Sequence, residues 1–298
     1  MKQIFLILLV SGAIPQVKAQ QLQTSSMYDL QGIFHNPATA GTQATNLIGA
    51  SYRTQWSGIS GGPKTATVFT SIDLPKHDIG LGGYLYSDKT GPTSRTGIQL
   101  AFAKHIPLKN GGKFSLGIEA KGTQYSIDRA KLQGSLGADP ALGITNNKMK
   151  FDAGFGAFYT GNKLQLGASV SQLVQTKLGY YTGNLTPTEE GRLYRHYYFH
   201  GGYKLVSDGS TVVTPNFLLI YMPNAPLTSQ FGVRVEHEEI FWWGLGLRLK
   251  QSIMFNAGVN IQKKFTIGYG YDIYKNPINT FDGGANAHEV LLRYNFSK

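Results

Sequence analysis

Two histidines in the second half of the chain have a spacing that can hold a metal ion. His196 and His200 are four residues apart, and on a helix two side chains at that spacing can share one zinc ion. The surrounding run YRHYYFHGGY predicts a strand instead, in which four residues span roughly 13 Å. One ion cannot bridge that distance, so we expect no metal site here and assign both histidines to an aromatic girdle.

Other residues have the chemical types needed for hydrolysis or phosphate binding. The run HEE at 237–239 falls at a predicted strand end without a complete ligand set, which indicates a solvated turn. Asp282, His288 and Ser297 could form a nucleophilic triad, but no serine lies in a G-x-S-x-G elbow. The run GYGYDI places its glycines in a strand, and no GK[ST] follows, so it predicts no phosphate loop. We therefore expect no enzyme activity and no cofactor.

The sharpest candidates for a functional site are Arg53, Gln55 and Trp56, at the end of a predicted strand. We expect Arg53 and Gln55 to face the interior of a barrel, and Trp56 to anchor the membrane interface or hold the turn that follows. A buried charge needs a partner, and Asp73 on the next strand is the candidate for Arg53. These residues would secure the NPATAG segment (Asn36–Gly41) or a partner protein; alternatively, they only brace the barrel.

The first 19 residues are predicted to be a secretory signal peptide, so the mature chain would begin at Gln20. Lys2 supplies a positive charge, Ile4–Val10 is an apolar core, and Val17–Ala19 resembles a cleavage site. The chain has no cysteine, and no later run approaches the roughly 18 apolar residues of a membrane-spanning helix. These features suit a protein of the bacterial outer membrane, whose strands alternate in polarity.

The chain is basic, with a formal net charge of +11 that falls to +9 when Lys2 and Lys18 leave with the signal peptide. Its basic residues are scattered rather than grouped in a block, so the charge does not predict nucleic-acid binding. We expect a basic lumen, or basic loops that face anionic lipid headgroups or an acidic protein partner.

From Ala44 onward, apolar and polar residues alternate, which predicts strands with one apolar face. Clear examples are Phe151–Tyr159 and Leu164–Val170, joined by a tight hairpin turn at Gly161-Asn162. Residues 44–298 provide roughly 14 strands long enough to span a bilayer. The predicted fold is therefore all-β, a transmembrane antiparallel β-barrel.

A polar segment, residues 20–43, precedes the predicted barrel. It could fold into the barrel lumen as a plug or remain a disordered tail, and Ile33 and Phe34 beside an Asn-Pro turn favour anchoring of its second half. The connections 128–147 and 183–191 are further candidates for a plug. A barrel of about 14 strands lies between the filled small barrels and the open porins, so we expect a narrow or plugged lumen.

Four short motifs occur in order near the start of the mature chain: NPATAG, YRTQWSG, PKT and DLP. Their combination resembles the PorP/SprF family of outer-membrane proteins of the type IX secretion system of Bacteroidetes. The resemblance continues weakly through Asp139-Pro140 and GYGYDI, and so covers essentially the whole mature chain. The candidate docking residues that it points to are Asn36, Pro37, Gly41, Arg53, Gln55, Trp56, Gly58, Pro63 and Asp73.

The resemblance implies a non-enzymatic component of type IX secretion or gliding machinery in the bacterial outer membrane. Expected partners are periplasmic ring proteins, peptidoglycan-binding lipoproteins, or the C-terminal domain of a secreted adhesin. Three alternatives stay open from the residues alone. They are an outer-membrane channel for small anionic solutes, an outer-membrane hydrolase, and a soluble β-propeller or lectin of similar composition.

Overall fold

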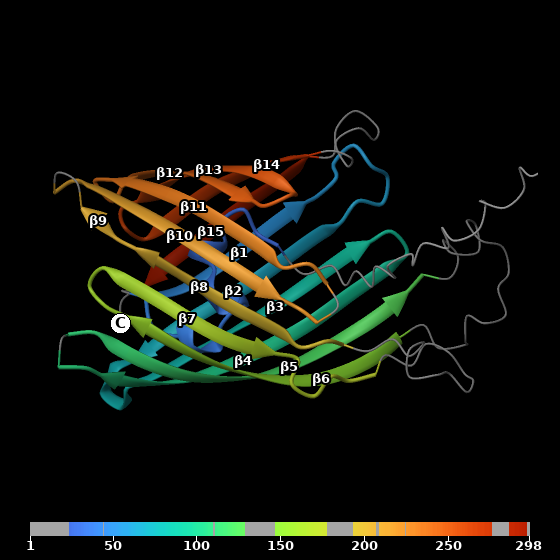
Figure 1. Cartoon of the computed structure of the whole chain (residues 1–298), viewed down its shortest axis with the longest axis horizontal. Helices are drawn as coiled ribbons and strands as arrows, with labels where there is room; N and C mark the ends of the chain where they lie inside the picture. The colour runs from blue at the N-terminus through green and yellow to red at the C-terminus, as the bar shows by residue number, and fades with distance from the viewer. Residues whose placement is uncertain are drawn as a thin grey trace, which may run out of the picture.

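Alternation of apolar and polar residues gives the chain one antiparallel sheet that curls into a barrel (Figure 1). The computed structural model describes residues 24–43, 45–109, 111–128, 147–177, 193–206, 209–223, 225–275 and 286–296. The strands are β1 (Asn46–Thr54), β2 (Lys64–Leu74), β3 (Ile79–Thr90), β4 (Thr93–Pro107), β5 (Lys113–Ile127), β6 (Asn147–Thr160), β7 (Leu164–Ser171), β8 (His196–Tyr203), β9 (Leu205–Val206), β10 (Thr211–Tyr221), β11 (Thr228–His237), β12 (Phe241–Arg248), β13 (Ser252–Ile261), β14 (Phe265–Tyr274) and β15 (Ala287–Phe296).

The sheet closes because its strands pair in chain order and its ends also meet. β15 pairs with β1, and β10 pairs with β11. β8 and the two-residue β9 both pair with β10, so they form one strand that is interrupted at Lys204. The fifteen strands of the described residues therefore count as fourteen around the wall, which confirms the predicted barrel.

The two faces of the wall have opposite polarity, as β14 illustrates. Phe265, Ile267 and Tyr269 point outward and are 44% to 50% exposed, whereas Thr266 and Asp272 point inward and are at most 1% exposed. The same period of two runs through the other strands, so the exterior is an apolar belt, and the interior carries polar side chains together with a smaller apolar core. An apolar exterior with a polar interior is the arrangement of a membrane-spanning barrel.

The two rims of the barrel differ in the length of the connections between strands. At one end, turns such as 161–163 and 238–240 join neighbouring strands; we call this end the short-turn rim. At the opposite end the connections include 128–146 and 172–195, and we call it the long-loop rim. Outer-membrane barrels have short turns on the periplasmic side, so the short-turn rim faces the periplasm. The chain enters β1 and leaves β15 at this rim.

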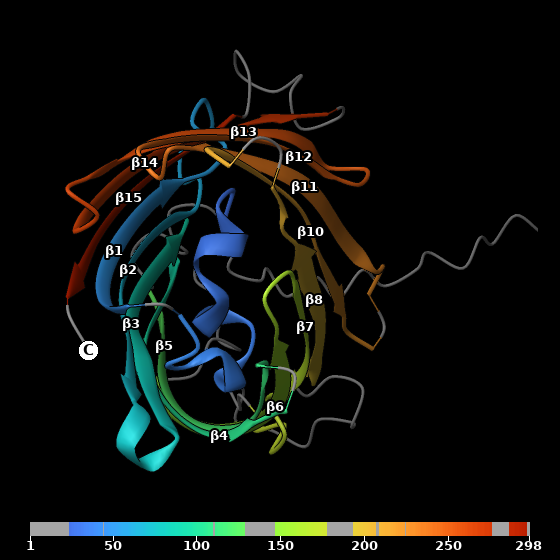
Figure 2. The ribbon, with the colours of Figure 1, turned by 90° about the vertical axis from the view of Figure 1, so that its left-hand side faces the viewer.

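A segment, residues 24–43, lies inside the barrel and crosses the lumen in the end-on view, and we call it the plug (Figure 2). It contains three single turns of 3₁₀ helix, η1 (Tyr28–Leu30), η2 (Gly32–Phe34) and η3 (Pro37–Thr39). A fourth turn, η4 (Pro75–His77), lies in the wall between β2 and β3. None of these described helices is long and apolar enough to cross a membrane. The described part of the predicted segment 20–43 thus lies in the lumen and is not a disordered tail, whereas residues 20–23 lie outside the described residues.

An apolar core lies between the plug and one side of the wall. Met27 and Ile33 of the plug are buried in a cluster with Phe69, Leu291 and Trp242 of the wall. Phe34 of the plug packs edge-on against the rings of Phe69 and Tyr84, with ring centroids 5.3 Å and 4.8 Å apart. Burial of a large apolar side chain contributes about 1.5–3 kcal/mol, so these contacts fix the plug against the wall.

Candidate functional site: contacts that hold the plug in the lumen

A group of four buried charges lies in the half of the lumen near the long-loop rim. Pairing of β1 with β15 sets Arg53 directly opposite Glu289. Both side chains point inward, where they meet Asp272 of β14 and Arg248 of β12. Each of the four residues is at most 3% exposed. Two arginines and two carboxylates balance in charge, which a buried cluster requires.

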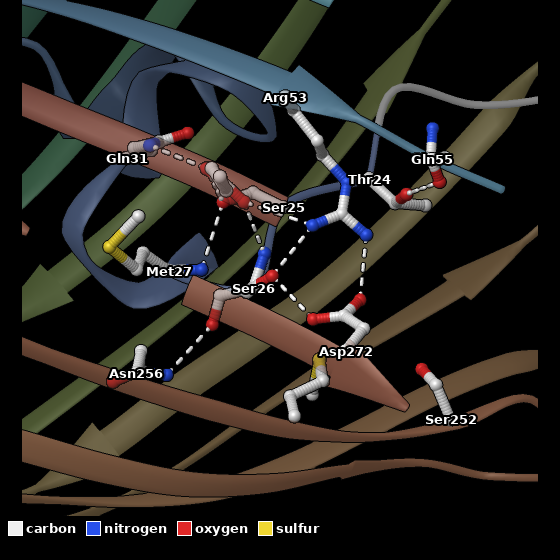
Figure 3. A network of polar contacts seen from close by, with 12 residues as sticks. Thr24, Ser25, Ser26, Met27, Gln31, Arg53, Gln55, Ser252, Asn256 and Asp272 are labelled. Atoms are coloured by element: carbon white, nitrogen blue, oxygen red, sulfur yellow. Dashed lines mark hydrogen bonds and ion pairs between the residues drawn. The ribbon is translucent and has the colours of Figure 1, made fainter. Parts of the chain in front are cut away.

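The plug enters this charge cluster through Ser25 and Ser26, and we call the six residues together the plug latch. Figure 3 labels four of them, Ser25, Ser26, Arg53 and Asp272. The Ser26 hydroxyl donates to Asp272 Oδ1 at 2.5 Å and accepts from Arg53 Nη1 at 2.6 Å. Arg53 Nη2 also pairs with Asp272 Oδ2 at 2.6 Å. The Ser25 hydroxyl donates to Glu289 Oε1 at 2.6 Å. Ser26 of the plug therefore adds a hydrogen-bonded bridge to the direct ion pair between Arg53 and Asp272 of the wall.

Side chains of the wall also satisfy the backbone of the plug. The Ser26 amide donates to Glu289 Oε2 at 2.7 Å, and the Ser26 carbonyl accepts from Asn256 Nδ2 at 3.0 Å. The Ser25 carbonyl accepts from Arg248 Nη2 at 3.3 Å. A buried backbone group without a partner costs roughly 1–3 kcal/mol, so these bonds specify where the chain of the plug must lie.

The predicted partner of Arg53 was wrong: Arg53 pairs with Asp272 and Glu289, and not with Asp73. Pairing of β1 with β2 sets Arg53 opposite Thr65, and Asp73 lies eight residues further along β2, near the short-turn rim. There the Asp73 carboxylate lies 3.7 Å from Lys113 Nζ. The prediction failed because it used strand adjacency without the register of the pair.

The other residues of the YRTQWSG and PKT motifs shape the long-loop rim. Gln55 follows β1, and its Oε1 accepts hydrogen bonds from Thr24 of the plug at 3.1 Å and from the Tyr274 hydroxyl at 2.9 Å. The Gln55 amide donates to the Pro63 carbonyl at 2.8 Å, which closes the connection between β1 and β2. Gln55 therefore contacts the start of the plug at Thr24, and not the NPATAG segment that it was expected to secure.

Trp56 and Gly58 lie within that connection. Trp56 has a φ of +55°, and its carbonyl accepts from the Ile59 amide at 2.8 Å. Trp56 thus holds the turn through its backbone, which was one of the two roles expected of it. Gly58 lies in the same turn, and the neighbouring Ser57 amide reaches the Asn286 carbonyl at 3.0 Å.

Asn36 fixes the second half of the plug to the opposite side of the wall. Its Oδ1 caps η3 by accepting from the Ala38 amide at 2.9 Å, and Pro37 occupies the first position of that turn. Its Nδ2 donates to the carbonyls of Ala157 at 3.0 Å and Ala168 at 3.4 Å. One amide therefore both shapes the plug and docks it on β6 and β7.

Glycines of the wall leave room for this part of the plug. A Cβ atom on Gly117 of β5 would lie 2.3 Å from the Ala38 amide nitrogen, and one on Gly156 of β6 would lie 2.0 Å from Asn36 Oδ1. Gly41 ends the segment with a φ of +69°, and its amide donates to Ser71 Oγ at 2.8 Å. The backbone of the plug and the backbone of the wall therefore touch without intervening side chains.

Both histidines examined for metal binding belong to the lumen, so their assignment to an aromatic girdle was wrong. His196 is 2% exposed, and His200 stacks on Phe158 with ring centroids 5.4 Å apart. His200 Nε2 also lies 3.1 Å from Asn36 Nδ2. Residues four apart share a face in a strand, but the spacing does not say which face. Among the described residues no group of histidine and acidic side chains could hold a metal ion.

Some of the remaining sequence predictions concern residues that the structure describes, and others do not. Glu238 and Glu239 form an exposed turn between β11 and β12, as predicted. Asp282, Ser297, Asp139-Pro140, residues 183–191 and most of the connection 128–147 lie outside the described residues.

Buried histidine also occurs within the plug itself. His35 follows η2, and its Nε2 donates to the Tyr28 carbonyl at 3.1 Å. Burial lowers the pKa of His35 to about 4, so the imidazole is neutral at pH 7. The Ser169 hydroxyl of β7 donates to the His35 carbonyl at 2.5 Å.

A cavity remains in the lumen between the plug and the wall, and we call it the vestibule. Its volume is about 510 Å³, and its lining includes Gln43, Asn162, Lys204 and Asn260 at the short-turn rim. The latch half of the lumen is tightly filled, because the space lined by Ser25, Arg53 and Glu289 has a volume of about 20 Å³. The described lumen is thus wider on the periplasmic side.

The fold and the latch together define this chain as an outer-membrane β-barrel of bacteria that carries an N-terminal plug in its lumen. Residues 17–294 match the family described as type IX secretion system membrane protein PorP/SprF, and the chain belongs to this family. The resemblance seen in the motifs of the first strands is thereby confirmed. No curated protein sequence matches the chain.

Solved structures of similar fold are outer-membrane proteins of low sequence identity. A CymD monoaromatic hydrocarbon channel is 10% identical, with 90% of this chain and 93% of that chain covered and a TM-score of 0.53. A FadL homologue of Pseudomonas aeruginosa is 11% identical, with 88% and 93% covered and a TM-score of 0.50. At this identity the likeness concerns the fold alone.

Proposed function

We propose that this barrel serves type IX secretion and gliding as an anchoring and docking component whose lumen stays closed. The observation that carries the proposal is the plug latch, in which Ser25 and Ser26 complete a buried, charge-balanced cluster with the wall. A plug that leaves this cluster gives up the hydrogen bonds of Ser25 and Ser26 to charged side chains, each of which is worth roughly 1.5–3 kcal/mol. A plug that stays in the lumen favours a rigid docking protein over a channel.

A closed barrel can act only through its rims and its lumen-facing surfaces. The short-turn rim would meet periplasmic ring proteins or peptidoglycan-binding lipoproteins, and the long-loop rim would hold the C-terminal domain of a secreted adhesin. The proposed role needs no catalysis, because docking depends on a fixed surface. At the long-loop rim Gln55 contacts Thr24 of the plug, so the plug would also stabilise the docking surface there.

A reversible tether between plug and wall tests whether the lumen must open. A Cβ atom on Gly82 would lie 3.0 Å from Ala40 Cβ, so the double variant Ala40→Cys, Gly82→Cys can form a disulfide after a shift of roughly 0.5 Å. The chain has no native cysteine to interfere. We expect secretion and partner co-purification to be equal in the oxidised and reduced double variant and in both single-cysteine controls. Secretion that stops on oxidation and recovers with reductant would contradict the proposal.

Removal of the plug tests its contribution to docking. Deletion of residues 24–43 with the signal peptide retained is expected to lower co-purification of type IX partners in detergent, identified by mass spectrometry. Heat-modifiable gel mobility serves as the control that the barrel still folds. Unchanged partner recovery by a folded deletion variant would show that the plug takes no part in docking.

A channel for small anions is the second candidate, and the vestibule is the observation that favours it. Its lining includes the cationic side chains of Lys204, Arg234 and Arg293, which would attract anions to the periplasmic mouth. The plug lies between this cavity and the long-loop rim. Conductance measurements separate the two candidates, because a channel conducts with the plug in place.

A further inference from the structure

The vestibule has the size and the access of a ligand site. Its volume of about 510 Å³ falls within the range of roughly 300–1,000 Å³ that is usual for small-molecule pockets. Asn162 and Lys204, which are exposed at the short-turn rim, belong to its lining and mark its mouth. Tyr28 and Asp29 of the plug line its inner side. A ligand would therefore enter from the periplasm and meet the plug.

The charges that line the vestibule are incompletely paired. Asp29 of the plug pairs with Arg234 of β11 at 2.7 Å. Arg293 of β15, by contrast, makes no ion pair with a carboxylate of the described residues, and its Nη2 donates only to Thr266 Oγ1 at 3.3 Å. Its buried Nε has no hydrogen-bond partner among those residues. Glu236 also belongs to the lining, so two carboxylates, Asp29 and Glu236, face three cations, Lys204, Arg234 and Arg293. An arginine without an ion-pair partner at the wall of such a cavity is a site for an anion.

Aromatic rings lie on other sides of the same cavity. The rings of Tyr28, Phe158 and Trp242 belong to its lining, and Trp242 is 2% exposed. A hydrated inorganic anion gains little from such rings. A carboxylate joined to an apolar or aromatic group can use both the guanidinium and the rings.

We propose that the vestibule binds a carboxylate that carries an adjacent apolar or aromatic group, with Arg293 as its anchoring cation. Two sources share this chemistry: a small organic acid of the periplasm, and the carboxyl terminus of a peptide segment. The guanidinium presents several N–H donors in one plane, which matches the two oxygens of a carboxylate. This proposal goes beyond docking at the rims and stands independently of it.

The test compares acids with their neutral amides on the full chain in detergent. Probes are N-acetylphenylalanine, its amide, a four-residue peptide that ends in phenylalanine, and the same peptide amidated, each titrated by calorimetry. Intrinsic tryptophan fluorescence provides a second readout, because Trp242, one of the three tryptophans of the chain, belongs to the lining of the vestibule. We expect each acid that binds to do so at least about 10-fold more tightly than its amide, because the amide loses a charged contact worth about 1.5 kcal/mol or more. Tighter binding of the peptide acid would indicate a partner terminus, and tighter binding of the amino acid would indicate a free solute.

Two variants assign the anchoring role. Arg293→Gln is expected to weaken acid binding at least about 10-fold, whereas the matched control Lys204→Gln at the mouth should change it about 2-fold or less. Heat-modifiable mobility verifies that each variant folds. Equal binding of acid and amide to the unaltered chain, no detectable binding of any acid, or competition by chloride alone as strong as by the acids would overturn the proposal.

Discussion

Replacement of Arg53 by glutamine removes one of the two cations that balance the plug latch. In the unaltered chain, Arg53 and Arg248 face Asp272 and Glu289, and the cluster is neutral. Arg53→Gln leaves two carboxylates with one arginine, all in a site that is at most 3% exposed. A buried ion pair that loses one partner destabilises a protein by roughly 3–5 kcal/mol, so we expect a loss of this size.

A second substitution restores the balance and makes the prediction specific. Glu289→Gln in the Arg53→Gln background leaves Arg248 with Asp272, whose atoms are 3.2 Å apart. The double variant should therefore be more stable than the sum of the two single losses, by roughly 1–3 kcal/mol of coupling. The glutamine at 289 can still accept from the Ser26 amide, so the plug keeps one of its bonds.

Equilibrium unfolding by urea in detergent micelles measures these differences, with the midpoint compared at constant slope. Proteolysis of the plug at low urea reports whether the latch half opens first. Strict additivity of the two single variants would refute the charge-balance reasoning. A loss below about 1 kcal/mol for Arg53→Gln would show that the cluster is solvated rather than buried.

Three further predictions concern the rest of the plug. Gly41→Ala should lower the free energy of unfolding in urea by roughly 1–3 kcal/mol, because residue 41 has a φ of +69° and the new Cβ would lie 2.7 Å from Gly80 Cα. An unchanged free energy of unfolding would exclude this close contact. Asn36→Asp keeps the hydrogen bond from the Ala38 amide but turns a carboxylate toward the carbonyls of Ala157 and Ala168, so it should destabilise the protein more than Asn36→Ala does. The reverse order would show that Asn36 contributes only as the cap of η3. Burial lowers the pKa of His35 from 6.5 to about 4, so a plug released from the lumen binds more protons than the bound plug. The attachment of the plug to the wall should therefore weaken by up to about 3 kcal/mol as the pH falls from 6.5 through 4. His35→Asn should reduce this pH dependence, measured as proteolysis of the plug over a pH series.

Much of the architecture could be predicted from the residues because a strand has a period of two. Alternation such as that of Phe265–Tyr274 gives both the strand and its apolar face, and repetition of the pattern gives the approximate strand number. The Asn-Pro turn with Ile33 and Phe34 also predicted that the polar segment is anchored. These features are local, so a single sequence contains them.

The partners within the lumen could not be predicted in the same way. Arg53 meets Glu289 because the last strand closes on the first with one particular register, and the sequence alone does not give that register. Ser25 and Ser26 have no distinctive signal in a polar segment. Asp272 offered the one usable hint, since it is an acidic residue on the inward face of an otherwise aromatic strand.

Single-channel conductance in planar bilayers tests the central claim, that the plug closes the lumen, most directly. The full chain and the chain without residues 24–43 are compared in the same lipid and salt, after both pass the heat-modifiable mobility control. We predict that the full chain is silent and that the deletion variant opens steady pores. Steady conductance of the full chain, equal to that of the deletion variant, would contradict a closed lumen and favour the channel.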